Sequence, residues 1–279
     1  MVFETLIEPI NAEKHSWRLI FLGMAYVSLA MMIAYWIFKD YASMVMIFLT
    51  VLASANIMHG IINFEEEQDE ESYDEKTLLS QHWNALLAFM FLFLGFTLAY
   101  TFWYVTLSFS VISPLFQAQN ATVARITGGH IAGFATQLST FNIIFSNNIK
   151  VLVVSLIFSF FYGYGAIFIL SWNASVIAAA AGSSFRQWMA THSAWYAIYA
   201  FPASLAQYAL HGSVEMAAFF VAALAGGIIG SAIAKKKWLD ADKFKKVIVD
   251  FLDLTILSVL LLFMAAIIEV WITPLIMIH

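Results

Sequence analysis

The chain has 279 residues, of which 62% are hydrophobic and only 11% are charged. So little polar surface cannot cover a soluble domain, and the composition therefore predicts an all-α, multi-pass membrane protein. The absence of cysteine excludes disulfides, thiolate catalysis and cysteine-ligated metals. The net charge of −5 comes largely from one acidic segment, so it gives no reason to expect a nucleic-acid partner.

The N-terminal part predicts two spans and an acidic linker. Residues 1–16 form a short polar leader without a cleavage signal, so we expect the first span to act as a signal anchor. Apolar runs predict spans at residues 17–38 and 41–63. The segment FEEEQDEESYDEK, residues 64–76, predicts a solvated acidic loop.

The next segment predicts one long span and an interfacial helix. Residues 82–110 are apolar for longer than a bilayer requires, so the third span should tilt or project. Pro114 and the polar run after it predict a loop. Apolar residues then recur at three- and four-residue steps over residues 131–145, which is typical of an amphipathic helix that lies on the membrane surface or caps the bundle.

Four further spans are predicted in the C-terminal half, at residues 149–172, 190–210, 211–237 and 251–273. Residues 174–182 are apolar but too short to cross, so they predict a re-entrant or interfacial piece. Pro202 interrupts the span that follows it. The whole chain is therefore expected to form a transmembrane helical bundle of about seven spans.

The distribution of lysine and arginine predicts the orientation in the cell membrane. With a cytoplasmic N-terminus, the inner segments hold ten of these residues, Arg186 among them, and the outer segments hold Lys39, Arg125 and Lys150. Seven spans then place the C-terminus outside.

The sixth span, HGSVEMAAFFVAALAGGIIGSAIAKKK, carries a small residue at every fourth position. This small-residue stripe consists of Ala218, Ala222, Gly226, Gly230 and Ala234. Such a stripe lets another helix approach closely in lipid. Glu215 lies about two turns from Ala222 on the same face, so its carboxyl should point into the bundle.

A polar cluster is expected near the outer surface, formed by Asn147, Asn148, His211, Glu215 and Glu269. Glu269 lies at the C-terminal end of its helix, where the helix dipole disfavours an anion. Its carboxyl must therefore be protonated, paired with another group or exposed to a water-filled cavity. We therefore expect it to contact His211 or Asn148. Alternatives remain open, since Asn147 could cap its span and Glu215 could offset the positive end of its own helix.

The sequence favours neither a metal site nor a cofactor. His211 and Glu215 share a helix face and could bind a divalent metal with Glu269, but the second histidine of an HExxH motif is missing. His130 would be a fourth ligand or a loop residue. No Ser-His-Asp order, phosphate loop or GxSxG motif supports a hydrolase, so we expect a protein that is not an enzyme.

Three motifs resemble the stage II sporulation protein M family: FSNNIKV leading into a span with GYG and WN, HGSVEMAAFFVAALAG, and IIEVWITP. The resemblance covers about residues 82–279. It implies a five-span core, to which residues 1–81 add a hairpin and an acidic loop. In spore-forming bacteria, it implies a membrane component of the engulfment machinery beside peptidoglycan-degrading partners.

Three functions remain open at this point. A scaffold or assembly component would contact the lipid bilayer, other membrane proteins or further copies of itself through the small-residue stripe. A transporter or channel would use Glu215 and Glu269 as a cation or proton site. A membrane-embedded metalloenzyme or lipid-handling protein would use a site beside His211. The resemblance favours the scaffold.

Overall fold

The computed structural model describes residues 16–71, 83–131, 137–162, 165–191, 195 and 197–276. Within these ranges every regular element is a helix. Seven of the described helices are long and apolar enough to cross a membrane, which confirms the predicted helical bundle of about seven spans. The predicted acidic loop at 64–76 was wrong in its first part, because a helix continues from Ala42 to Glu71. The rest of that segment and the leader up to residue 15 lie outside the described residues.

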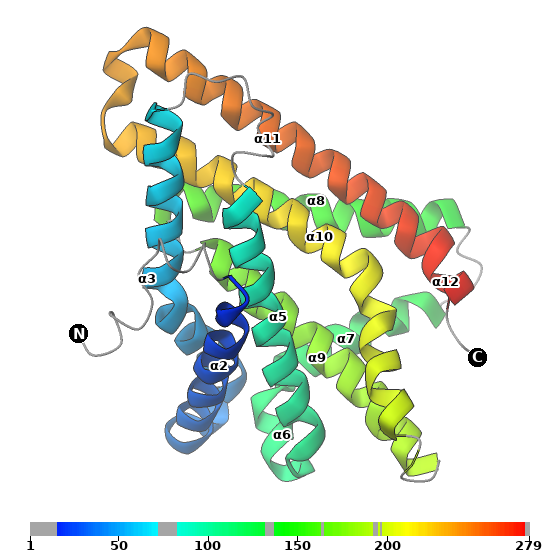
Figure 1. Cartoon of the computed structure of the whole chain (residues 1–279). Coiled ribbons are helices and arrows are strands. Elements are labelled where there is room, and N and C mark those ends of the chain that lie inside the picture. The colour runs from blue at the N-terminus through cyan, green and yellow to red at the C-terminus, as the bar shows by residue number, and fades with distance from the viewer. Residues whose placement is uncertain are drawn as a thin grey trace.

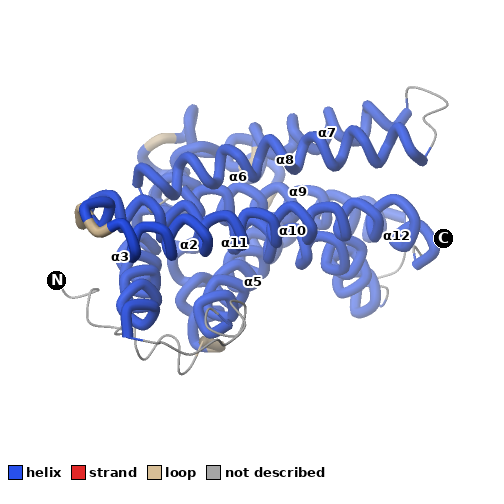
Figure 2. The backbone as a smooth tube through the Cα atoms, turned by 90° about the horizontal axis from the view of Figure 1, so that it is seen from above, coloured by secondary structure: helices blue, strands red, loops and turns tan. Residues whose placement is uncertain are grey.

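The elements follow one another as α2 (Arg18–Ile37), η1 (Lys39–Tyr41), α3 (Ala42–Glu71), α5 (Trp83–Thr106), α6 (Phe109–Leu115), α7 (Gln117–Ile131), α8 (Gln137–Tyr162), α9 (Gly165–Thr191), α10 (Ala197–Ala234), η3 (Lys237–Leu239), α11 (Ala241–Ile267), η4 (Ile268–Ile272) and α12 (Thr273–Ile276). In one group α2 packs on α3 and α5, and in the other α10 packs on α8 and α11, while α9 contacts both (Figure 1). Seen from above, the α10–α11 turn and α12 lie at opposite ends of the molecule (Figure 2).

Helix α8 corrects two of the predicted elements. The surface helix at 131–145 and the span at 149–172 were both wrong, because one continuous helix runs from Gln137 to Tyr162. Its candidate span is Gln137–Phe160. The paired asparagines looked like a boundary, but Asn148 lies inside the helix with its side chain bonded to another helix, so it does not end α8. The predicted loop after Pro114 was also wrong, since α6 includes this proline and α7 follows.

Two more predicted elements, in the region of helices α9 and α10, also differ from the structure. The predicted re-entrant piece at 174–182 was wrong, because it is the middle of α9, a candidate span over Ile167–Thr191. The nearby Asn173 returns its side-chain amide to the carbonyl of Ile169 at 2.8 Å, so it is accommodated within the helix. The predicted span at 190–210 is not separate, since its described part from Ala197 onward is the start of α10.

Helix α10 bends in its first half, as Figure 1 shows. This part contains Pro202, which lacks a backbone N–H and crowds the preceding turn, so a kink is expected there. The candidate span within α10 begins after the proline, at Leu210, and continues to Ala234.

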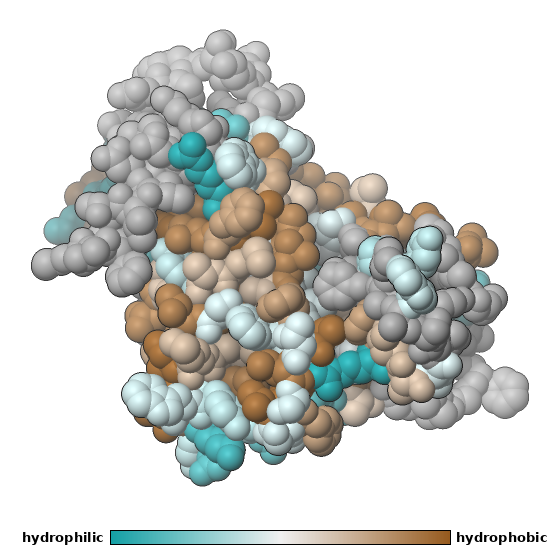
Figure 3. Space-filling model, turned by 60° about the horizontal axis from the view of Figure 1, so that its bottom comes forward, coloured by the Kyte–Doolittle hydropathy of each residue, from teal (hydrophilic) through white to brown (hydrophobic). Residues whose placement is uncertain are grey.

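Exposed aromatic side chains lie near the ends of the spans. Trp17, Trp83 and Trp238 lie at the starts of α2 and α5 and in the α10–α11 turn. A second set, Trp36, Tyr41, Trp195 and Tyr199, lies near the other end of α2 and at the start of α10. Such residues favour the boundary between lipid and water. Between them, apolar side chains cover much of the visible surface (Figure 3).

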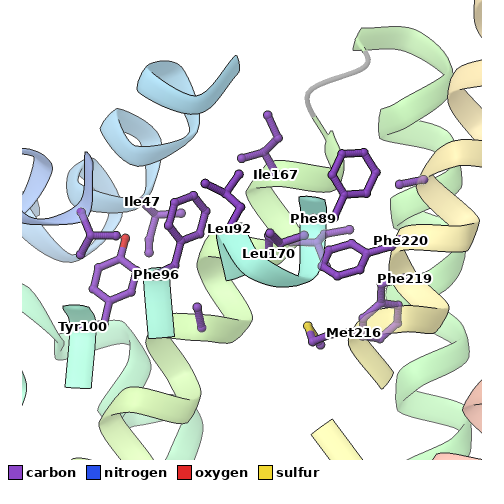
Figure 4. Packing of buried hydrophobic residues seen from close by; sticks show 14 of the residues in the cluster. Ile47, Phe89, Leu92, Phe96, Tyr100, Ile167, Leu170, Met216, Phe219 and Phe220 are labelled. Carbon is purple, nitrogen blue, oxygen red and sulfur yellow. The ribbon is translucent and has the colours of Figure 1, made fainter. Parts of the chain in front are cut away.

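A buried aromatic contact joins the two helix groups. Phe89 of α5 and Phe220 of α10 point toward each other, with ring centroids 5.5 Å apart (Figure 4). Both side chains are almost completely buried. The contact fixes the distance between α5 and α10 and so ties the N-terminal helices to the group that contains the small-residue stripe.

Tyr100 joins three helices through one hydroxyl. It belongs to α5 and is fully buried. Its hydroxyl bonds to Thr50 Oγ1 of α3 at 3.0 Å and to Ser171 Oγ of α9 at 3.1 Å. Because water is absent from the hydrocarbon region, these hydroxyls can be satisfied only by one another or by backbone carbonyls.

We expect Tyr100→Phe to lower the free energy of unfolding by about 1 kcal/mol, because it removes a hydroxyl that links three helices. The measurement is equilibrium unfolding of the purified protein in detergent. Tyr41→Phe is the matched control, since Tyr41 is 75% exposed. Equal stabilities of the two variants would contradict the assigned role of Tyr100.

Candidate functional site

Helices α8 and α10 pack side by side and run in the same direction. Asn148 of α8 bonds to Glu215 of α10, and farther along α8 Phe160 contacts Gly230. The contacting residue numbers therefore rise together along both helices. This parallel arrangement requires that both helices begin on the same side of the membrane, and α9, which connects them in the sequence, runs back in the opposite direction.

The contact is closest at two glycines of the small-residue stripe. A Cβ atom added at Gly226 would lie 2.6 Å from the carbonyl oxygen of Leu156, and one added at Gly230 would collide with the backbone of Phe160. The backbones of α8 and α10 thus approach each other directly. Of the alanines of the stripe, Ala218 and Ala222 are fully buried, whereas Ala234 is exposed.

One polar bond joins the same two helices nearer their starts. The amide nitrogen Nδ2 of Asn148 donates to Glu215 Oε1 at 2.5 Å. Asn148 is buried and Glu215 is partly buried. Asn147 is exposed and lies well inside α8, so it neither joins the cluster nor caps the helix. Ser155 adds a longer bond from α8 to α10, donating to the carbonyl of Phe219 at 3.4 Å.

The C-terminal end of α11 brings Glu269 to this cluster. Glu269 belongs to η4, a short π-helix, and is partly buried. Its carboxyl lies close enough to that of Glu215 for their charges to interact. Asn148, one of the two residues expected to contact Glu269, bonds to Glu215.

His211 contacts the residue that follows η4. Its Nδ1 lies 3.3 Å from Thr273 Oγ1, and this hydroxyl donates to the carbonyl of Ile268 at 3.1 Å. A proton on Nδ1 satisfies both bonds, because the threonine oxygen then accepts from the histidine. The carbonyl of Ile268 also accepts the backbone N–H of Thr273, the bond that closes the π turn.

Aromatic side chains pack α8 against the end of α11. Phe141 of α8 lies 5.4 Å from Phe263 and 5.7 Å from Trp271, measured between ring centroids. Phe145 also contacts Phe263, at 5.9 Å. The apolar residues that predicted a surface helix are thus used to pack α8 against α11 and η4.

Among the described residues, no group of three or more histidine, aspartate or glutamate side chains could hold a metal. His211, Glu215 and Glu269 therefore do not form the divalent-metal site that the sequence left as an alternative. The side chain of His130 lies outside the described part of the chain.

The structural role of Arg186 was not predicted from the sequence. This residue of α9 donates to the carbonyls of Tyr104 at 3.0 Å, Val105 at 3.1 Å and Leu107, at the C-terminal end of α5. Its guanidinium carbon also lies 5.9 Å from the centroid of the Tyr104 ring. A cation at this position satisfies terminal carbonyls and complements the helix dipole. The sequence feature that could have indicated this role is a single arginine near the end of an apolar segment.

We expect Gly226→Ala to destabilise the protein by about 1–3 kcal/mol, because the added methyl group meets a backbone carbonyl that cannot move independently. Gly212→Ala is the control in the same helix, since its Cβ would meet only Ile177 Cδ1, at 3.8 Å. The control should be neutral or slightly stabilising by helix propensity. Equal effects in thermal unfolding would contradict the close contact at Gly226.

We expect Asn148→Ala to cost about 1–3 kcal/mol, because it leaves Glu215 without its amide donor inside the bundle. Asn147→Ala should have little effect, since that side chain is exposed. A double-mutant cycle of Asn148→Ala with Glu215→Ala, each of which removes one partner of the bond, would measure the coupling, which we expect to exceed about 0.5 kcal/mol. Purely additive effects would show that the bond contributes nothing.

The sequence matches the family described as stage II sporulation protein M over residues 88–274, about two thirds of the chain. The match includes α8, α10 and α11 with their polar cluster and confirms the resemblance seen in the sequence. Neither the curated proteins nor the solved structures contain a match. The chain is therefore a multi-span membrane protein that belongs to the stage II sporulation protein M family.

Proposed function

We propose that the protein is a non-enzymatic scaffold, an assembly component of a membrane complex. The observation that carries this proposal is the use of polar groups between α8, α10 and α11. Asn148 bonds to Glu215, and His211 contacts Thr273. Polar side chains that are used for helix association stabilise one arrangement of the helices, as a scaffold requires.

The burial of the spans supports the same proposal. Helix α10 has the most buried candidate span, while α8 and α11 are among the least buried. Large apolar side chains on the outward faces of these two helices are exposed, including Ile157 and Phe158 of α8 and Leu260 and Met264 of α11. A tightly held central helix with two outer apolar faces would offer surfaces to lipid, to other membrane proteins or to a second copy of the chain.

We also propose that the N-terminus is cytoplasmic and the C-terminus is outside. Arg186 contacts the end of α5, so it belongs with the outer segments in this orientation rather than with the inner ones. Lys150 lies in the middle of the candidate span of α8 and counts for neither side, so the lysines and arginines number nine inside and three outside. The excess on the inner side still favours this orientation.

A transporter is the second candidate, and one observation favours it. Glu215 and Glu269 are only partly buried and lie close enough for their charges to interact. One follows the bend of α10 and the other lies in a π-helix, and irregular membrane helices often hold ion sites. In this alternative, the pair would bind a cation or proton.

One preparation can distinguish the two functions. Protein extracted into native-lipid nanodiscs should give particles that contain a second copy or another membrane protein, as measured by mass photometry and mass spectrometry. The same protein in liposomes should pass no protons, Na⁺ or K⁺ above the level of protein-free liposomes.

Particles with a single chain at all concentrations would argue against the scaffold. Cation flux that is lost in Glu269→Gln would establish the transporter instead. Asp253→Asn is the matched control for flux, because it removes an exposed acid from α11.

A further inference from the structure

The helix pair α2–α3 lies outside the family match, which begins at residue 88, yet it packs along the matched helices. Helix α2 contacts α5, and α3 contacts α9 and α7. Figure 1 shows both helices beside α5. The surface under this hairpin therefore belongs to the part of the chain that the family shares.

The hairpin and α5 meet at glycines on both helices. A Cβ atom at Gly95 of α5 would collide with the backbone of Ile20, and one at Gly23 of α2 would lie 3.0 Å from the carbonyl oxygen of Leu92. Each helix thus carries a small residue where the backbone of the other approaches. This mutual fit is typical of a specific helix–helix association in lipid.

Three side chains of the matched part also bond to the hairpin. Trp103 Nε1 donates to Ser28 Oγ at 2.8 Å, and the hydroxyl of Tyr100 bonds to Thr50 Oγ1 at 3.0 Å. Gln119 Nε2 makes a longer bond of 3.4 Å to a carbonyl of α3. Tyr100 and Gln119 are both fully buried. Without the hairpin, Trp103 and Gln119 would lose these partners, and the Tyr100 hydroxyl would keep only its bond to Ser171.

We propose that this surface, formed by Gly95, Tyr100, Trp103 and Gln119 and here called the hairpin face, is a helix-docking site of the family core. The chain's own α2–α3 hairpin occupies it and keeps other transmembrane helices away. The partner that fits the face is a two-helix membrane hairpin with a small residue opposite Gly95 and hydroxyl groups opposite Tyr100 and Trp103. The inference is independent of the proposed scaffold function, which rests on α8, α10 and α11.

The test cuts the connection between hairpin and core in the assembled, full-length protein. A protease site is inserted between Lys76 and Thr77, the purified protein carries a C-terminal affinity tag, and it is cleaved in detergent. We expect the N-terminal fragment to remain on the affinity resin with the tagged core. Immediate loss of this fragment would overturn the proposal.

Exchange shows whether the hairpin face is a docking site. Two cleaved preparations are mixed, one of which carries a fluorescent label on its N-terminal fragment. We expect labelled hairpins to appear gradually on cores that began with unlabelled ones. If no exchange occurs over days at a temperature where the protein remains folded, the hairpin is a permanent part of the fold and the proposal is wrong.

Two variants test the contacts on the hairpin face. Gly95→Leu should release the hairpin after cleavage, because its side chain would collide with the backbone of α2. Leu94→Phe is the control, since it adds bulk at the exposed neighbouring position. Retention of the hairpin by a folded Gly95→Leu protein would overturn the proposal.

If Gly95→Leu fails to fold, the double variant Ser28→Ala/Thr50→Val tests the same contacts. It removes two hydroxyl groups of the hairpin and adds no bulk, so the fold should remain. We expect release to be roughly 3- to 30-fold faster, the effect of losing about 0.6–2 kcal/mol of hydrogen bonding. An unchanged release rate would show that the polar contacts do not hold the hairpin on this face.

Discussion

The parallel contact between α8 and α10 is the constraint on which the rest of the fold depends. The contact consists of a glycine interface and a polar bond, and each meets a different requirement of a protein in lipid. The glycines at 226 and 230 give close packing without a hydrophobic driving force, and the bond from Asn148 to Glu215 satisfies a carboxyl group where water is scarce. Because α8 and α10 are parallel, the connecting helix α9 must cross the membrane in the opposite direction. Helix α11 then returns along α10 and brings Glu269 close enough to Glu215 for their charges to interact.

Composition and hydropathy were sufficient to predict the class of protein and the approximate number of spans, because bilayer thickness fixes how long an apolar helix must be. The boundaries between residues 113 and 210 were not predictable in the same way. Polar residues such as Asn148 and Asn173 looked like helix ends, yet their amides bond to another helix or to their own backbone. A sequence shows that such a group exists but not where its partner lies, so polar runs in a membrane helix are ambiguous.

The candidate site was likewise predictable in part, since the sequence indicated which residues lie near one another but not which of them bond. Reasoning about depth brought Asn148, Glu215 and Glu269 to one side of the membrane, and these residues lie together in the structure. Which of them bond depends on the rotation of each helix about its axis, and that rotation is set by packing. The glycines turn one face of α10 toward α8, and the aromatic contacts of Phe141 turn α8 toward Phe263 and Trp271. The role of Arg186 likewise depends on α9 ending beside the end of α5.

The π-helix η4 has a consequence for the length of the chain. A π turn contains one residue more than an α turn, and this extra residue lies between Ile268 and Ile272. The wide turn absorbs this extra residue, so removing it would restore regular α-helix and leave the following side chains on their present faces. Removing or adding a residue in the regular part of α11 would instead rotate everything after it by about 100°, and Thr273 would turn away from His211. Single-residue deletions should therefore be tolerated better within η4 than in the regular helix that precedes it.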